Sequence, residues 1–217
     1  MIDDYKHKGM RKKLVQVIKE KGISNRSVLK AIGEIPRHFF FDKIFLEHAY
    51  QDKAFPIGEG QTISQPYTVA FQTELLNVKH GSKILEIGTG SGYQASVLVA
   101  LGAEVYTIEY QKKLYEKTKE FLPRAFGYEP HFFYGDGSKG LLQYAPYDGI
   151  IVTAGAPTVP SDLIKQLKIG GVLVIPVGNN QKQRMLKITR ISENKLSKKE
   201  YNHFSFVPLL GANGWNH

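Results

Sequence analysis

The chain has 217 residues, of which 42% are hydrophobic and 12% aromatic, so it can bury a full core, and its length suits a single α/β domain over residues 1–217. It has no cysteine, which excludes a disulfide framework, and no apolar run close to the roughly 20 residues that cross a bilayer. Because Met1 to Arg11 is too polar for a secretory signal, we expect a cytoplasmic protein with no membrane association.

The net charge of +9 is concentrated in residues 1–21 and 182–200, which carry +4 and +5, while the remainder sums to zero. Solvated helix and loop faces explain such charge most simply, with weak attraction to RNA or acidic proteins as the alternative. The sequence contains no zinc-ligand spacing, helix-turn-helix pattern or RNP-like aromatic run. We therefore predict neither a specific nucleic-acid partner nor a bound metal.

The first third of the chain, residues 1–78, reads as a helical cap followed by a loop. Apolar residues at helical spacing precede the stops at Gly22 and Pro36. The segment 54–65 fits neither the helical nor the strand period and is rich in glycine and proline, which predicts a long connecting loop. Pro66 then suits the first turn of the next helix, because proline lacks an amide hydrogen that would have no partner there.

Beyond Lys79 short apolar runs alternate with helical segments, at residues 83–87, 104–108, 131–134, 149–154 and 171–177. Continuous apolar strands are buried on both faces, which predicts a doubly wound, mostly parallel sheet of Rossmann-like type over residues 79–217. Two later runs, 185–191 and 201–210, are separated by polar residues. They predict an antiparallel hairpin at the sheet edge.

A glycine-rich turn, Gly88-Thr89-Gly90-Ser91-Gly92, joins the first of these strands to a helix. Alternate glycines let the backbone turn tightly beneath a ligand, and a helix amino terminus offers free amide groups. The spacing is G-x-G-x-G, whereas the dinucleotide fingerprint is G-x-G-x-x-G, and position 93 is tyrosine. The turn predicts a nucleoside site, with a merely structural turn as the alternative.

Acidic residues end the next two strands. Glu109 follows the glycine turn by about 20 residues, where a carboxylate can accept hydrogen bonds from ribose hydroxyls. Asp136 and Gly137 end the following strand, where a carboxylate could receive an adenine amino group. Ligands of open α/β sheets bind at the carboxyl ends of strands. This arrangement is typical of a class I S-adenosylmethionine methyltransferase, with a nicotinamide enzyme as the second reading.

Five motifs resemble the protein-L-isoaspartate O-methyltransferase family in the same order. They are GQTISQPYTVA, LEIGTGSGYQASVL, YDGIIVTAGAP, IKQLKIGGVLVIPVG and FVPLLGANGW. The resemblance implies that Ser64 is the active-site serine and that the substrate cleft is shaped by Thr62, Ile63, Gln65, Pro66, Val207, Pro208 and Leu209. It implies cofactor contacts at Glu86, Gly88, Thr89, Gly90, Ser91, Gly92, Glu109, Tyr110, Asp136 and Gly137, although Glu86 could instead only hold the turn.

The implied reaction moves a methyl group from S-adenosyl-L-methionine to the free carboxyl of L-isoaspartyl residues in damaged proteins and peptides, leaving S-adenosyl-L-homocysteine. The ester then cyclises to a succinimide, whose hydrolysis returns some normal aspartate. A carboxylate is ionised at neutral pH, so no strong general base is needed, and Ser64 would orient the acceptor oxygen. The family further implies a monomer.

Three other functions remain open at this point. The basic segments and the same cofactor motifs would also suit a methyltransferase of RNA or of a small molecule. A noncatalytic nucleoside-binding module and an NAD dehydrogenase are further alternatives, the last disfavoured by the glycine spacing.

Overall fold

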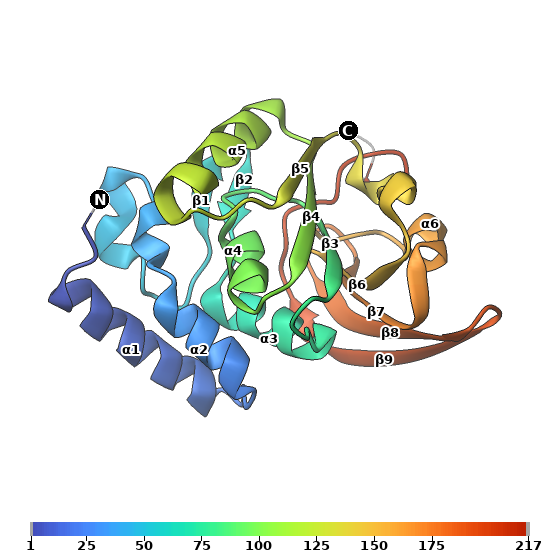
Figure 1. Ribbon diagram of the computed structural model, residues 1–217, viewed down its shortest axis with the longest axis horizontal. Coiled ribbons are helices and arrows are strands. Elements are labelled where there is room, and N and C mark those ends of the chain that lie inside the picture. Colours follow the sequence, from blue (N-terminus) through green and yellow to red (C-terminus); the bar gives the residue numbers. More distant parts are fainter. Residues whose placement is uncertain (1, 216–217) are drawn as a thin grey trace.

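The computed structural model describes residues 2–215, and its amino-terminal part is a helical cap (Figure 1). Helices α1 (Tyr5–Glu20) and α2 (Arg26–Glu34) begin where Asp4 and Asn25 accept hydrogen bonds from free backbone N–H groups of the first turn. Two short 3-10 helices follow, η1 (Arg37–Phe40) and η2 (Lys43–His48). The expected cap is therefore present.

The segment 54–65, expected to be a loop, instead contains an antiparallel hairpin. Strand β1 (Phe55–Gly58) pairs with β2 (Gln61–Ile63) across a turn whose Glu59 and Gly60 have φ of 51° and 68°. Strands of three or four residues are too short for a side-chain period to be visible in the sequence. Helix α3 (Pro66–Leu76) then starts with proline at its first position, as expected.

One seven-stranded sheet forms the body of the molecule, with the order β5-β4-β3-β6-β7-β8-β9. Its first five members are parallel to one another, and β7-β8-β9 is antiparallel. The strands are β3 (Lys83–Ile87), β4 (Glu104–Glu109), β5 (His131–Tyr134), β6 (Tyr147–Val152), β7 (Leu167–Gly178), β8 (Gln183–Ser192) and β9 (Lys195–Phe204). The doubly wound class with an antiparallel edge is confirmed.

The sequence predicts the last strand within residues 201–210, but β9 begins earlier in the chain, at Lys195. The polar residues 195–200, expected to separate two strands, belong to β9, and residues 205–210 lie beyond it. An edge hairpin exposed to water has no buried face along that stretch, so its strand carries no apolar run. Figure 1 shows the β8–β9 hairpin extending past the rest of the sheet.

Neighbouring residues of the central strands enter two different cores. Ile84 and Val105 pack with the cap helices, whereas Leu85 and Tyr106 pack on the opposite face with Leu163 of α6. Because successive side chains of a strand point to opposite faces, strands covered on both sides must be apolar throughout. This explains the unbroken apolar runs in the sequence.

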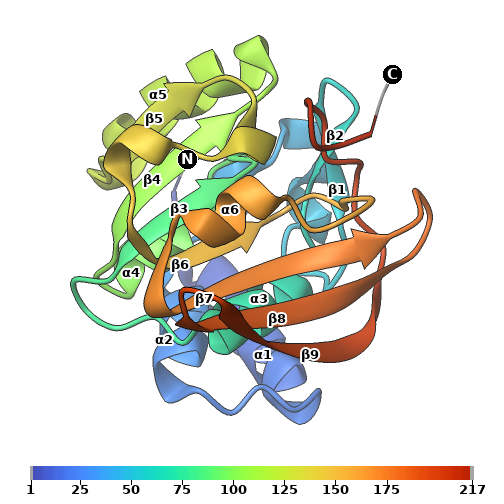
Figure 2. The same cartoon turned by 90° about the vertical axis from the view of Figure 1, so that its right-hand side faces the viewer.

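Helices cover both faces of the sheet (Figure 2). Contacts with the strands come from α3, α4 (Tyr93–Ala100) and α5 (Lys112–Phe126) on the cap side, and from α6 (Ser161–Lys165) on the other. The cap joins the body through Phe40, whose ring contacts those of Tyr93 and Phe126. Within residues 2–215 no helix is long and apolar enough to cross a membrane.

Candidate active site

The glycine turn lies at the carboxyl end of β3. Gly88 and Gly90 have φ of 93° and 51°, a region that side chains disfavour, and a Cβ on Gly88 would press against Thr153 Oγ1. Gly92 has φ of 83° and is the N-cap of α4, but a Cβ added to it would press against Thr118 and Leu122 of α5. The first two glycines therefore shape the turn, while the third permits helix packing behind it.

Glu109 closes the turn from the neighbouring strand. Its Oε2 accepts the Gly90 N–H at 2.8 Å, and its Oε1 accepts the Gln111 N–H at 2.8 Å. A carboxylate has about four lone-pair sites, so two remain for a ligand. The side chain is 5% exposed and borders the pocket above the turn, which suits a carboxylate that receives hydroxyl groups.

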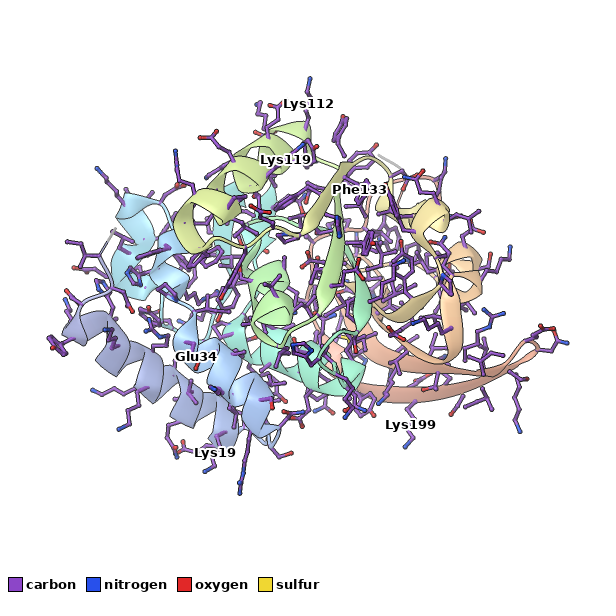
Figure 3. The ribbon with its side chains drawn as sticks, viewed as in Figure 1. Lys19, Glu34, Lys112, Lys119, Phe133 and Lys199 are labelled. Atoms are coloured by element: carbon purple, nitrogen blue, oxygen red, sulfur yellow. The ribbon has the colours of Figure 1, made fainter. Side chains whose placement is uncertain are left out.

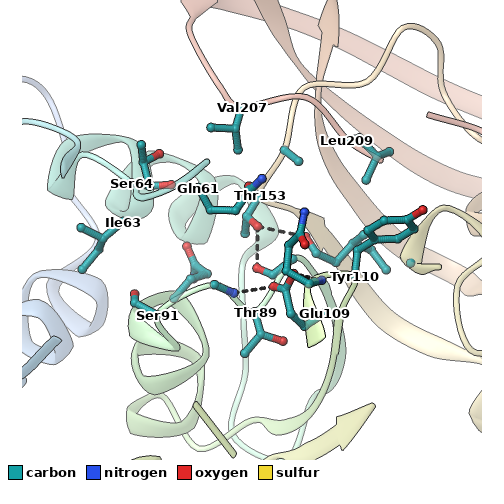
Figure 4. Close-up of a pocket in the computed structure, with 18 of the residues that line it drawn as sticks. Gln61, Ile63, Ser64, Thr89, Ser91, Glu109, Tyr110, Thr153, Val207 and Leu209 are labelled. Carbon is teal, nitrogen blue, oxygen red and sulfur yellow. Dashed lines mark hydrogen bonds between the residues drawn. The ribbon is translucent and has the colours of Figure 1, made fainter. Parts of the chain in front are cut away.

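A pocket opens above these strand ends, with a void of about 740 Å³ when the adjoining open solvent is included (Figure 4). Figure 4 shows Ser64 and Tyr110 on opposite sides of it. The sequence-predicted residues that line the pocket are Thr62, Ile63, Ser64, Gly88, Thr89, Gly90, Ser91, Glu109, Tyr110, Gly137, Val207, Pro208 and Leu209. Segments separated by more than 100 residues therefore meet at one site.

Glu86 does not reach this pocket. Its side chain is fully buried beneath the turn, where its Oε2 accepts the Thr107 hydroxyl at 2.5 Å, and Thr107 is in turn 2.6 Å from the Thr89 hydroxyl. Burial raises the pKa of Glu86 to about 8. The geometry thus supports the alternative in which Glu86, held as the neutral acid at pH 7, only braces the turn.

Asp136 is also placed differently from the expectation of an adenine contact. One carboxylate oxygen accepts the Ser138 N–H and hydroxyl at 2.9 and 2.7 Å, and the other accepts the Ala212 N–H at 2.8 Å. These hydrogen bonds hold the pKa of Asp136 below its usual value despite partial burial, which opposes them. Its carboxylate ties the carboxyl-terminal segment to the sheet, while Gly137 beside it lines the pocket.

Two residues of the expected substrate cleft serve the loop itself. Gln65 Nε2 donates to Asp52 Oδ2 at 3.0 Å, and Asp52 Oδ1 accepts the Tyr67 N–H at 2.8 Å. Pro66 is buried at the start of α3. Gln65 borders a second, outer groove, and Pro66 borders neither space.

A buried arginine that the sequence analysis missed holds the Ser64 loop. Arg37 has no exposed surface, and its guanidinium donates to the Ser64 carbonyl at 2.9 Å and to the Ala49 carbonyl at 3.1 Å. It also lies 4.6 Å from the centre of the Tyr93 ring, a cation–π distance. Burial lowers the pKa of Arg37 to about 10, so it remains charged at neutral pH.

Thr153 is a second residue that was missed, although the sequence contained a signal for it. It follows strand β6, and its hydroxyl lies 2.7 Å from the Gly88 carbonyl and 2.9 Å from that of Ile87. The strand-end rule that selected Glu109 and Asp136 would also have selected it. Arg37 carried no such signal, because a single arginine after a helix is ordinarily a surface residue.

Comparison with known proteins decides the family. A model of the protein-L-isoaspartate(D-aspartate) O-methyltransferase family matches residues 9–214. The chain belongs to this family.

Relatives of the same name cover the whole chain. A protein-L-isoaspartate O-methyltransferase of Cytophaga hutchinsonii is 58% identical over 100% of this chain and 97% of its own length. One of Christiangramia forsetii is 60% identical over 97% of this chain and 98% of its own length. The prediction from the five motifs is therefore confirmed.

Solved structures agree with this family. A protein-L-isoaspartate O-methyltransferase superposes with a TM-score of 0.83 and 31% identity, covering 94% of this chain and 66% of that one. A Plasmodium falciparum protein assigned to the same class, in complex with S-adenosyl-L-homocysteine, gives a TM-score of 0.79 and 25% identity, covering 92% of this chain and 98% of that one. The reaction class and the cofactor predicted from the sequence, methyl transfer from S-adenosyl-L-methionine, are confirmed for the family to which the chain belongs.

The residue roles predicted from the sequence stay predictions, as do a monomeric state and the division into a cap of residues 1–78 and a cofactor-binding part of residues 79–217. Among residues 2–215 no three histidine, aspartate or glutamate side chains gather as ligands for a metal ion.

Proposed function

We propose that this chain methylates the free carboxyl group of L-isoaspartyl residues in damaged proteins and peptides, and that Ser64 positions that carboxyl. The observation that carries the proposal is the place of Ser64, which borders both the pocket above the glycine turn and an open groove on its outer side. A polypeptide in the groove can thus present one side chain past Ser64 to the pocket.

The pocket residues fit an adenosyl ligand. Glu109 keeps free lone pairs beside a turn that holds no side chain at Gly88 or Gly90, and Tyr110 offers an aromatic ring at the rim. We assign the ribose hydroxyls to Glu109 and the adenine ring to the neighbourhood of Tyr110 and Gly137. S-adenosyl-L-methionine supplies the methyl group from its sulfonium when bound.

The chain's own contribution to the chemistry is positioning. The acceptor carboxylate is already ionised at neutral pH, which agrees with the serine at the junction of the two spaces, where residues 2–215 supply no histidine–acid pair. The Ser64 hydroxyl donates to one carboxylate oxygen and aligns the other for in-line attack. Val207 and Leu209 exclude water from the opposite wall.

The test is transfer of tritium from methyl-labelled S-adenosyl-L-methionine to two peptides that differ only in an isoaspartyl or a normal aspartyl linkage. We expect labelling of the isoaspartyl peptide alone, as base-labile methyl ester, followed by succinimide formation without further enzyme. Equal labelling of both peptides, or of neither, would refute the proposal. Labelling of RNA in their place would favour the nucleic-acid alternative.

The cytoplasmic location stays a prediction from the sequence.

A further inference from the structure

A groove with an overall void of about 1,720 Å³ lies outside the Ser64 loop, between the cap and the edge hairpin. It shares Thr62, Ser64, Thr153 and Val207 with the inner pocket, so the two spaces are continuous. Its outer parts come from the end of α1, the first turn of α3, the β7–β8 turn and the end of β9. A substrate chain that delivers a residue to Ser64 must lie along it.

Apart from Tyr67, the ionisable side chains that line the groove are all basic. Its lining contains Lys21, Lys182 and His203 but no aspartate or glutamate. Lys21 is already neutralised, because its Nζ lies 2.5 Å from Asp52 Oδ2, and the Asp52 side chain is only 8% exposed. Within residues 2–215 no carboxylate lies within ion-pair distance of Lys182, which is exposed to solvent.

Arg184 adds to the positive charge at the same end of the groove. Its strand position pairs directly with His203, and its nearest acidic partner, Glu200, is 3.9 Å away and also binds Lys198 at 2.9 Å. Desolvation and the nearby charges of Lys182 and Arg184 lower the pKa of His203, so His203 is mostly neutral at neutral pH and the positive charge here belongs to the lysine and the arginine. Glu200 is shared between Arg184 and Lys198, so this rim of the groove keeps a net positive charge.

The facing wall of the groove is aromatic. The Tyr67 ring lies 6.4 Å from that of Phe204 at an interplanar angle of 16°, and Phe204 lies 6.4 Å from Phe206. Aromatic walls next to a charged rim accommodate a peptide's apolar and charged side chains together. A nucleic-acid strand would need a row of unpaired cations along its phosphates, whereas the groove lining offers Lys182 as its one lysine outside an ion pair among residues 2–215.

We propose that this groove selects isoaspartyl segments that carry an acidic side chain within about two residues of the damaged position, and that Lys182 is the main determinant of this preference. The inference rests on the proposed function. It goes beyond it by naming the sequence context of the preferred substrate. The groove attracts an acidic side chain and repels a basic one. A peptide with an acidic neighbour should therefore have a kcat/KM about threefold to tenfold higher than one with a basic neighbour at low salt.

The experiment compares isoaspartyl peptides that carry Glu, Gln or Lys two residues before or after the isoaspartate. For the wild-type protein we expect the highest kcat/KM for the Glu peptide, then Gln, then Lys, at the position before or the position after the isoaspartate. The ratio of kcat/KM between the Glu and Lys peptides should fall toward one as salt rises to 0.5 M. Lys182→Glu should reduce the Glu-to-Lys ratio several-fold or invert it. Equal rates for the three peptides on both sides, or an unchanged ratio in Lys182→Glu, would overturn the proposal.

Lys199→Glu is the matched control. Lys199 lies on β9 of the same hairpin, points away from the molecule in Figure 3 and does not line the groove, yet the substitution makes the same change in net charge. It lies opposite Lys187, so a glutamate there gains a partner. We expect its Glu-to-Lys ratio to stay within twofold of wild type. An equal effect of Lys199→Glu and Lys182→Glu would mean that only net charge matters, against the proposal.

A binding measurement separates the two hypotheses. Fluorescein-labelled versions of the same peptides, titrated with protein saturated in S-adenosyl-L-homocysteine, report the preference without catalysis. If no isoaspartyl peptide is methylated, the proposed function fails. The order of peptide affinities measured by fluorescence anisotropy still tests whether the groove prefers an acidic neighbour. Single-stranded RNA that displaces the Glu peptide, with affinity lost in Lys182→Glu, would assign the rim to nucleic acid and overturn the proposal.

Discussion

The cofactor side and the substrate side of this site are built in different ways. On the cofactor side, Gly88, Glu109 and Gly137 stand at the ends of neighbouring strands, so their positions follow from the sheet. On the substrate side, Ser64 depends on a buried arginine of the cap and faces Val207 of the carboxyl-terminal segment. The hydrogen bonds between neighbouring strands fix the position of a residue at a strand end, whereas a loop between distant segments is held in place by tertiary contacts.

A further contrast lies in what supports each side. Beneath the glycine turn the support is polar but neutral, because Glu86 keeps its proton and joins Thr107 and Thr89. Behind the Ser64 loop the support is a buried positive charge without a carboxylate partner within residues 2–215. Substitutions should therefore separate cofactor binding from peptide turnover.

The largest expected effect is on stability, in Glu86→Gln. The folded pKa of Glu86, about 8, lies above its ordinary value of 4.5, so between these values the unfolded chain loses a proton that the folded chain keeps. Stability conferred by the neutral acid is complete below pH 4.5 and is lost as pH rises to about 8. Glutamine stays neutral, so its advantage should grow by up to about 4 kcal/mol between pH 5 and 8. Urea unfolding at both pH values measures it, and parallel pH profiles would contradict it.

Arg37→Met should have the largest effect on turnover. The substitution removes the donor to the Ser64 and Ala49 carbonyls, each hydrogen bond to a charged group contributing about 1.5–3 kcal/mol. We expect kcat/KM for isoaspartyl peptide to fall by about a hundredfold, while calorimetric binding of S-adenosyl-L-homocysteine changes less than threefold. Arg37→Lys keeps the charge and should recover part of the loss. Parallel losses in peptide turnover and cofactor binding would mean that Arg37 supports the whole fold.

Ser64→Ala should reduce isoaspartyl methylation and spare the cofactor. Loss of one hydrogen bond to a carboxylate, about 1.5–3 kcal/mol, corresponds to roughly ten- to hundredfold in rate. The melting temperature should hardly change, because the side chain does not cap α3. A folded, cofactor-binding variant that turns over peptide at the wild-type rate would return Ser64 to a structural role.

Glu109→Ala should have the opposite signature. Cofactor affinity should weaken by about 1.5–3 kcal/mol, since the proposed ribose contacts would be lost and the Gly90 N–H loses its acceptor. At saturating cofactor the KM for peptide should stay within about threefold of wild type. Calorimetry with S-adenosyl-L-homocysteine measures the first value, and unchanged affinity would remove Glu109 from the ribose site.

The smallest effect is expected from the basic amino-terminal helix. Lys12 and Lys13 are exposed, so replacing both with glutamine should change kcat/KM for an uncharged isoaspartyl peptide by less than twofold. Arg11→Met is the contrasting variant, because Arg11 is buried and binds Asp3 and Tyr50 at 2.9 and 3.0 Å. It should lower the melting temperature. A large kinetic loss in the lysine variant would show that the basic segment takes part in catalysis.

Features that depend on local order follow from the amino-acid sequence alone. Apolar runs buried on both faces fixed the parallel strands, and the ends of those strands placed Glu109 and Gly137 at one edge, because strand direction and side-chain alternation are properties of neighbouring residues. The family and its reaction followed from motifs spread over nearly the whole chain.

The groups that meet across long separations in the chain are set by the tertiary structure. It turned Asp136 toward Ala212, buried Arg37 behind Ser64, and joined Lys182 and Tyr67 in one groove. It also folded residues 55–63 into a hairpin for which the sequence shows no alternation of apolar and polar residues. A side chain's partner 27 or more residues away is chosen by packing and desolvation over the whole chain, and no local pattern records that choice.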